Sequence, residues 1–331
     1  MSARTAGRLS PGAWEFAEWP NVPGHNRRVR ILVASTAFPA AADLLGELLP
    51  EDEILIDHRH ADPPVDVIVP LMSRVDAPML DRFQPRLIHQ FGVGLEGVDL
   101  DAAAERGIAV ANVPAAGTGN ADGVGEVAVM HLLVLARRLR EAGAAMAARR
   151  LGEPIGMPLT GARVVIIGLG AVGQAVVARL GGFGARLIGV GSRSRSELSP
   201  GVAALELADY LPAADLLTAL TDADALIVCA ALNDETRGLV GDPELAAMRR
   251  GAYVVNVARG PILDYPALLG ALRSGQIGGA GLDVYWDEPI DPEDPLLAEN
   301  VSLTPHIGGV TTFSYRRIAE RVAAGIERHR P

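Results

Sequence analysis

Residues 159–180 read LTGARVVIIGLGAVGQAVVARL and constrain the fold more than any other stretch of this 331-residue chain. The β-branched run at 164–167 is typical of a strand buried on both faces, and a helical pattern follows over 174–180. Between them Gly168, Gly170 and Gly173 have G-x-G-x-x-G spacing, which allows a tight turn, close backbone approach to a pyrophosphate and close helix packing. Glycines alone could form a chance turn. With this strand and helix beside them, they predict a dinucleotide site at a helix N-terminus.

Length and charge narrow the class of protein. A chain of 331 residues is long enough to form two domains of ordinary size. The net charge of −10 gives no basic footprint, so nucleic acid and anionic membrane are poor partners and small molecules are better ones. All 30 Lys and Arg residues are arginine, which excludes Schiff-base lysine chemistry. No apolar run reaches about 18 residues, and the first residues lack a signal-peptide layout. We therefore expect a cytoplasmic protein that does not cross a membrane.

Strand and helix patterns alternate along most of the chain. Residues 1–27, with Trp14 and Trp19, have no periodicity and are expected to be an irregular N-terminal extension. Strands are expected at 29–35, 53–57, 65–70, 86–92 and 108–111, and six more at 163–167, 186–190, 225–229, 252–256, 279–284 and 301–303. This rhythm predicts an α/β fold with two doubly wound parallel-sheet domains, Rossmann-like and flavodoxin-like, and a cleft between them. We expect residues 1–115 and 306–331 to form a substrate-binding domain and residues 116–305 to form the dinucleotide-binding domain.

One long helix is expected over 123–140. Its mostly apolar part, 127–136, is about half the length needed to cross a bilayer, which indicates a buried helix that could also serve a dimer interface. Arg137, Arg138 and Arg140 would lie in its last turns, where cations suit the helix dipole. His131 in this run is more typical of a core or interface histidine than of a catalyst.

The residues after the second strand of the glycine-rich domain bear on the choice of cofactor. In such folds an acidic side chain about 20 residues after the first glycine usually binds the adenosine ribose of NAD. Here that position is Gly191, and Ser192, Arg193, Ser194 and Arg195 follow it. These donors include no carboxylate that would repel a 2′-phosphate. They could also form a solvated arginine loop. NADP(H) is favoured, and NAD(H) remains possible.

Three later segments place polar residues after expected strands, where open α/β sheets bind their ligands. They read VVNVARGPILD, GLDVYWDEP and LTPHIGG. Together with the glycine turn, they make the chain resemble the D-isomer-specific 2-hydroxyacid dehydrogenases, in particular their glyoxylate/hydroxypyruvate reductase-like branch. The resemblance covers roughly residues 65–330 and implies an enzyme that transfers a hydride between a nicotinamide cofactor and a small 2-oxo acid or D-2-hydroxy acid.

The resemblance implies a catalytic triad of Arg259, Glu288 and His306. Arg259 would hold the substrate carboxylate with its planar fork of donors. His306 would exchange a proton with the substrate oxygen, and Glu288 would hydrogen-bond His306 and favour the imidazolium. Without the resemblance, Arg259 could be a surface arginine, His306 a structural histidine and Glu288 a solvated carboxylate of its acidic loop.

The resemblance also implies substrate and cofactor contacts. The backbone amides of Val93 and Gly94 in QFGVG would bind the substrate carboxylate opposite Arg259, Asp283 would bind the nicotinamide carboxamide, and no metal is implied. Together with the ribose-side donors, the expected cofactor contacts are Gly168, Gly170, Ala171, Val172, Gly173, Ser192, Arg193, Ala230, Val257, Ala258, Asp283 and Gly308.

Some features leave alternatives open. A proline usual in the family is Ala231 here, and Met72 stands where phosphoglycerate dehydrogenases have arginine, although Arg74 remains. A phosphoglycerate dehydrogenase-like enzyme is therefore disfavoured. Corepressors that resemble the same family keep the triad, so a cofactor-sensing binding protein is the other alternative. The family's habit and the helix at 127–136 predict a homodimer built on the cofactor domain.

Overall fold

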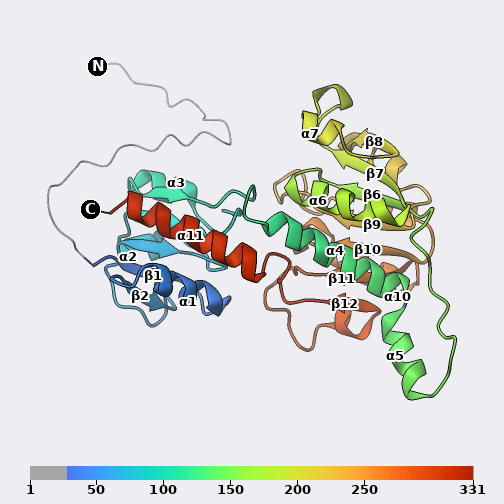
Figure 1. The fold of residues 1–331 in the computed structure, drawn as a ribbon, viewed down its shortest axis with the longest axis horizontal. Coiled ribbons are helices and arrows are strands. Elements are labelled where there is room, and N and C mark those ends of the chain that lie inside the picture. Colours follow the sequence, from blue (N-terminus) through green and yellow to red (C-terminus); the bar gives the residue numbers. More distant parts are fainter. Residues whose placement is uncertain (1–27, 331) are drawn as a thin grey trace. The chain divides into compact units, whose positions relative to one another are not determined.

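The computed structural model describes residues 28–330, which divide into two compact units (Figure 1). Unit 1 contains residues 28–114 and 316–330, and unit 2 contains residues 115–315. The extension expected at 1–27 lies outside the described residues. The chain passes back from unit 2 to unit 1 after Tyr315, ten residues later than the sequence led us to expect.

Unit 1 is built on a five-stranded parallel sheet. Its strands are β1 (Arg30–Val33), β2 (Glu53–Ile56), β3 (Val67–Val69), β4 (Leu87–His89) and β5 (Ala109–Ala111), in the order β2-β1-β3-β4-β5. Its helices are α1 (Pro39–Leu48), α2 (Ala77–Phe83), α3 (Leu100–Glu105) and the unit 1 part of α11 (Thr312–Arg328). The strand order is the flavodoxin-like doubly wound order, so the expected fold class is confirmed for this unit.

The C-terminal residues are held to unit 1 by packing and charge. Ile318, Val322 and Ile326 of α11 are buried. Arg330 forms an ion pair with Asp52 at 2.6 Å, and Gly325 leaves room for the ring of His89. Burial lowers the pKa of His89 to about 4, so this histidine is neutral in the core near neutral pH.

Unit 2 contains a seven-stranded parallel sheet. Its strands are β6 (Arg163–Ile167), β7 (Arg186–Gly191), β8 (Asp209–Pro212), β9 (Ala225–Val228), β10 (Ala252–Asn256), β11 (Ile277–Leu282) and β12 (Val301–Leu303), in the order β12-β11-β10-β9-β6-β7-β8. From β6 the strands run outward in both directions, which is the Rossmann arrangement extended by one strand. The topological switch point lies between β6 and β9, at whose carboxyl ends such folds bind ligands.

Helices cover both faces of this sheet. The helices of unit 2 are α4 (Asn120–Ala136), α5 (Leu139–Ala147), α6 (Ala171–Leu180), α7 (Pro200–Ala203), α8 (Leu216–Leu220), α9 (Asp242–Ala247) and α10 (Tyr265–Arg273), of which α5 lies away from the sheet (Figure 1). Alternate residues of β6 enter two separate cores: Val164 and Ile166 pack with the α4 and α6 side, and Val165 and Ile167 with the side of α8 to α10. A strand buried on both faces explains why 164–167 is continuously apolar.

Two expectations about elements of unit 2 were wrong. Six strands were expected, and the seventh, β8, has the sequence DYLP, whose proline and terminal position suit a sheet edge but give little strand signal. The helix expected over 123–140 ends at Ala136, because Arg138 has a left-handed backbone with φ 52° and α5 begins after it. Arg137, Arg138 and Arg140 therefore do not occupy the last turns of one long helix.

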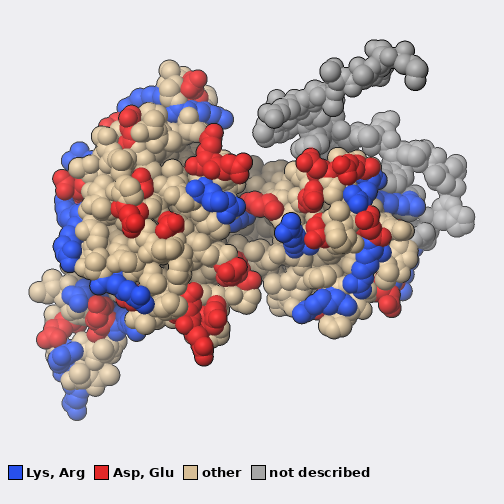
Figure 2. Space-filling model, turned by 180° about the vertical axis from the view of Figure 1, so that it is seen from behind, with Lys and Arg blue, Asp and Glu red and all other residues tan. Residues whose placement is uncertain are grey.

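The surface carries no broad basic area on the face shown in Figure 2, where acidic and basic side chains are interspersed over the described residues. This is in keeping with the net charge of −10. Within residues 28–330, no helix is both long enough and apolar enough to cross a bilayer.

Candidate active site

The glycine-rich turn joins β6 to α6 at the switch point. Gly168 has φ +87°, and a Cβ atom there would lie 2.6 Å from the backbone nitrogen of Ala230. Gly173 packs against the carbonyl of Gly168, so it too can carry no side chain. Gly170 precedes α6, and a Cβ placed on it would meet no atom within 4 Å. The turn therefore has close packing on the protein side and open space in front of the helix N-terminus, which fits a pyrophosphate.

The end of β7 has no room for an acidic side chain. A Cβ on Gly191 would lie 2.7 Å from the phenol oxygen of Tyr210, and that hydroxyl donates to the carbonyl of Arg193 at 2.7 Å. Ser192 and Arg193 are exposed, whereas the guanidinium of Arg195 contacts Asp209 at 3.4 Å. Tyr210 thus fills the space beside residue 191, the position that usually carries the acidic ribose ligand in NAD-binding folds of this kind.

The turn after β10 is fixed by one buried side chain. Asn256 is fully buried; its Oδ1 accepts from the amide of Ala258 at 3.0 Å, and its Nδ2 donates to the carbonyl of Arg259 at 2.9 Å. Val257 and Ala258 are buried, and Arg259 is half-buried. The next residue, Gly260, packs against the backbone of Tyr285 and Trp286. This contact joins the turn that carries Arg259 to the loop that carries Glu288.

His306 and Glu288 form a hydrogen-bonded pair, with 2.7 Å between His306 Nδ1 and Glu288 Oε2. The other oxygen of Glu288 accepts from the amide of Tyr285 at 3.0 Å. A carboxylate can only accept, so Nδ1 of His306 carries the proton of this bond. Both side chains are largely buried, with relative exposures of 24% and 18%.

Glu288 is held in its charged form. Burial works against ionisation, but the hydrogen bond and charge of His306, the amide of Tyr285 and the charge of Arg259 outweigh it and lower the pKa of Glu288. The structure therefore brings together two predicted triad members by direct contact and the third by its electrostatic influence. The ionised carboxylate of Glu288 thus places a negative charge in contact with the His306 ring.

Asp283, expected at the nicotinamide, already holds the histidine segment. Its Oδ1 accepts from Thr304 Oγ1 at 2.6 Å and from the amide of Ile307 at 2.8 Å, and its Oδ2 accepts from the amide of Gly308 at 2.8 Å. His306, between these anchors, has a left-handed backbone with φ 55°. Such a conformation costs a non-glycine residue about 1 to 3 kcal/mol and persists where the surroundings determine it.

The predicted carboxylate-binding amides lie in unit 1, in the loop after β4. Gln90 Nε2 donates to the carbonyls of Gly94 and Leu71 at 2.9 and 3.0 Å, and Asn112 donates to the carbonyl of Val93 at 2.7 Å. The loop is thus held through its carbonyl oxygens. Within residues 28–330 the amides of Val93 and Gly94 donate to no protein acceptor, so they are open to an anion.

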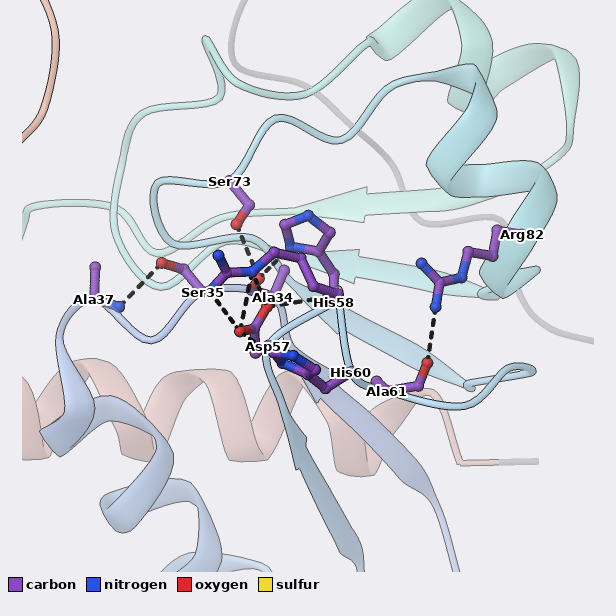
Figure 3. A network of polar contacts seen from close by, with 10 residues as sticks. Ala34, Ser35, Ala37, Asp57, His58, His60, Ala61, Ser73 and Arg82 are labelled. Carbon is purple, nitrogen blue, oxygen red and sulfur yellow. Dashed lines mark hydrogen bonds and ion pairs between the residues drawn. The ribbon is translucent and has the colours of Figure 1, made fainter.

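Polar side chains also join the neighbouring strand ends of unit 1 (Figure 3). Ser73 Oγ and His58 Nδ1 both donate to the carbonyl of Ala34, at 3.0 and 2.7 Å. Asp57 accepts from His60 at 3.1 Å and from Arg59, whose hydrogen bonds lower the pKa of Asp57. The contacts with Ala34 tie the loops after β2 and β3 to the end of β1.

Several residues that shape the site were not predicted. Asn256 and Thr304 stand inside the NVARG and TPHIGG segments, and their short polar side chains next to predicted site residues were the available signal. Tyr210 gave no signal because it lies on the strand that was not expected. His131 was predicted only as a core or interface histidine, and its partners are Ser302 of β12 and Thr304, just after that strand.

The glycine turn at a Rossmann switch point, with an ionised glutamate and a histidine joined at the same sheet's later strand ends, defines a nicotinamide-dependent dehydrogenase. Comparison with known proteins agrees. Residues 129–308 match the family model described as D-isomer specific 2-hydroxyacid dehydrogenase, NAD binding domain. The chain is 34% identical over 276 residues to a glyoxylate reductase of Thermococcus litoralis, which covers 79% of this chain and 80% of that protein.

Two further relatives cover most of the chain. A glyoxylate reductase of Aeropyrum pernix is 32% identical over 323 residues, covering 91% of this chain and 92% of that protein. The crystal structure of an NADPH-dependent glyoxylate/hydroxypyruvate reductase from Sinorhizobium meliloti, in complex with NADP and malonate, has 30% identity and a TM-score of 0.76, covering 91% of this chain and 93% of that one. The chain belongs to the D-isomer-specific 2-hydroxyacid dehydrogenase family. It is an NAD(P)-dependent oxidoreductase that acts on CH–OH donors.

Proposed function

We propose that the protein reduces a small 2-oxo acid, such as glyoxylate or hydroxypyruvate, with NADPH, or oxidises the corresponding D-2-hydroxy acid. The observation that carries this proposal is the His306–Glu288 pair at 2.7 Å, in which Nδ1–H is committed to the carboxylate and Nε2 is the second ring nitrogen. The names of the relatives support the substrate class, since three of them are glyoxylate or hydroxypyruvate reductases.

The chain's own residues would divide the work as follows. Arg259 binds the substrate carboxylate and polarises the neighbouring carbonyl. The open amides of Val93 and Gly94 are the other proposed carboxylate ligands. In reduction, Nε2–H of His306 donates a proton to the carbonyl oxygen, and in oxidation the neutral Nε2 removes it from the hydroxyl.

The cofactor would be held by the glycine turn and by Ala171 and Val172 at the start of α6, and Val257 and Ala258 would contact its nicotinamide. When bound, the nicotinamide supplies the hydride for reduction or accepts it in oxidation. Ala230 backs the turn through its contact with Gly168. Asp283 keeps one oxygen that accepts a single amide bond, so a carboxamide donor could share it.

A substrate panel tests the proposed function. Purified protein is assayed with glyoxylate, hydroxypyruvate, pyruvate and a phosphorylated 2-oxo acid, each with NADPH and with NADH. We expect the highest kcat/KM with a small unphosphorylated 2-oxo acid. No turnover of any 2-oxo acid would contradict the proposal and favour a cofactor-sensing binding protein.

We predict that Arg193 gives NADPH its advantage over NADH. Tyr210 lies where a side chain at residue 191 would point. The guanidinium of Arg193 is exposed and makes no hydrogen bond within residues 28–330, and its charge acts on Glu197 and Tyr210. A charge-assisted contact with a 2′-phosphate is worth about 1.5 to 3 kcal/mol. Arg193→Ala should therefore reduce the NADPH/NADH ratio of kcat/KM by about tenfold or more.

Arg195→Ala is the matched control for this prediction. It removes the same charge two residues away, but Arg195 is engaged with Asp209. The control should change the cofactor ratio by less than about threefold, as expected for an exposed ion pair. Wild-type preference for NADH, or equal losses in the two variants, would show that Arg193 does not recognise the phosphate.

We further propose a homodimer formed through unit 2. The helix α5 and the segment after it project from the sheet of this unit (Figure 1) and expose Met146, Leu151 and Ile155, the last two by 91% and 87%. Beside α5, a depression of about 700 Å³ is lined mainly by apolar side chains of α4, including Met130 and Leu133, together with Leu139 and Phe183. Apolar patches of this kind mark interfaces. A second copy would cover them by a two-fold contact.

The dimer prediction is tested by sedimentation velocity at micromolar concentration. We expect wild type to sediment as a dimer and Leu151→Glu/Ile155→Glu to sediment as a monomer, because two charges would be buried without partners. Ile56→Glu, at a 49% exposed position of unit 1, should remain dimeric. A monomeric wild type, or a dimer that tolerates both glutamates, would contradict this interface.

A further inference from the structure

His131 is a fully buried histidine of α4 with a hydroxyl on each side of its ring. The helix packs over β10, β11 and β12 within unit 2 (Figure 1). His131 Nδ1 lies 2.9 Å from Ser302 Oγ, and Nε2 lies 2.9 Å from Thr304 Oγ1. The ring has room because residue 281 of β11 is glycine: a Cβ there would lie 2.5 Å from Cβ of His131. The site for this imidazole is therefore built from three elements.

The protons of this network can be assigned from its acceptors. Asp283 is a carboxylate and can only accept, so the one hydrogen of Thr304 Oγ1 points to Asp283 Oδ1, 2.6 Å away. Thr304 Oγ1 must then accept from His131, which places a hydrogen on Nε2. In the neutral ring Nδ1 is an acceptor, and Ser302 donates to it. Burial lowers the pKa of His131, in keeping with this neutral form.

The network ends at the segment that carries His306. The order of donation is His131 to Thr304, then Thr304 to Asp283, and Asp283 also accepts the amides of Ile307 and Gly308. A hydroxyl that accepts one hydrogen bond donates a stronger second one, so His131 strengthens the short Thr304–Asp283 bond. Asp283 in turn fixes the two residues after His306, whose backbone is left-handed.

We propose that His131 is a positioning residue that, through Thr304 and Asp283, sets the backbone of the His306 segment and so the direction of the His306 imidazole. The effect on turnover rests on the proposed function, because His306 must act on the substrate oxygen. The effect on the His306 segment itself does not. His131 is too far back in the core to be reached by substrate, since its ring is enclosed by α4, Gly281 and the two hydroxyls.

Three single variants separate the two sides of the ring. His131→Leu removes both contacts. His131→Gln can place an amide donor near the former Nε2 and keep the bond to Thr304. Ser302→Ala removes only the contact at Nδ1. Because small displacements of a catalytic group cost large factors in rate, we expect kcat to fall about tenfold in His131→Leu, with the KM for the 2-oxo acid changed by less than about twofold.

We expect His131→Gln to recover most of that kcat, and Ser302→Ala to stay within about twofold of wild type. Equal kcat in His131→Leu and wild type would overturn the proposal. A loss in Ser302→Ala as large as that in His131→Leu would also overturn it, because the loss would then come from disturbed packing and not from the bond to Thr304. Thermal unfolding of each variant identifies any that fails to fold. If His131→Leu does not fold, the kcat values of His131→Gln and Ser302→Ala test the proposal.

A double-mutant cycle tests whether His131 acts on the His306 segment through Thr304. Thr304→Val removes the hydroxyl through which His131 is proposed to act. If the route is correct, adding His131→Leu to Thr304→Val should lower kcat by less than about twofold more, whereas independent effects would multiply. Multiplying effects would overturn the proposal.

The His306 ring provides a readout that needs no substrate. Its imidazole C–H resonance, assigned by its absence in His306→Ala, should shift or broaden in His131→Leu and return toward the wild-type position in His131→Gln. An unchanged resonance in His131→Leu would overturn the positioning role, even if wild type turned over no 2-oxo acid. Absence of turnover with a shifted resonance would reject the proposed function and keep the positioning role.

Discussion

Replacing His306 with alanine is expected to lower kcat for 2-oxo acid reduction by about two to four orders of magnitude, the usual contribution of a positioned acid or base. The structure gives the reason. Nδ1–H of His306 is committed to Glu288 at 2.7 Å, so its other nitrogen is the one that can exchange a proton with substrate. Steady-state kinetics with saturating NADPH measure the loss. Cofactor affinity, followed by NADPH fluorescence, should be nearly unchanged, because the glycine turn is formed by other residues.

Glu288→Gln is the companion to this variant because it keeps the shape and removes the charge. An ionised Glu288 can stabilise the positive charge that His306 carries before it gives up its proton, and a neutral amide cannot. We therefore expect kcat for 2-oxo acid reduction to fall by about tenfold in Glu288→Gln, less than in His306→Ala, with the KM for the 2-oxo acid changed by less than about twofold. An unchanged kcat in Glu288→Gln would leave Glu288 as a structural carboxylate, and a small effect of His306→Ala would remove the histidine from the chemistry.

Local patterns in the sequence were sufficient to predict the fold class and most strands. The continuous apolar run at 164–167 and the glycines after it were enough to place β6 and α6, because burial on both faces and a helix N-terminus each leave a local signature. β8 could not be found in this way. Its four residues are held at the sheet edge by pairing with β7, and that pairing is a tertiary interaction that DYLP does not encode by itself.

The same distinction holds for the site. Arg259, Glu288 and His306 stand in short motifs, so they could be named before the structure was considered. The contact between Glu288 and His306 joins residues 18 positions apart and depends on where two strands of one sheet end. The His131 contacts join residues 171 and 173 positions apart, and a single histidine in an apolar helix has no pattern that indicates such partners.

Arg259→Ala is expected to differ in kind from His306→Ala. A guanidinium that binds the carboxylate does so in the ground state and in the transition state, so its loss should raise the KM for the 2-oxo acid as well as lower kcat. Two charge-assisted bonds at about 1.5 to 3 kcal/mol each predict a loss in kcat/KM of at least about a hundredfold. NADPH affinity should remain, which distinguishes the effect from damage to the cofactor site.

Arg259→Lys is the informative control, because it keeps the positive charge and loses the planar fork. The turn that carries residue 259 should survive both substitutions, since Asn256 holds it through the carbonyl of residue 259 and the amide of Ala258. If geometry matters, lysine should recover only a small part of the loss, and added guanidinium ion should restore more activity to Arg259→Ala than to Arg259→Lys, where the ammonium occupies the site. An unchanged KM in Arg259→Ala would mean that the ground-state carboxylate is held elsewhere, and the amides of Val93 and Gly94 would then be its principal ligands.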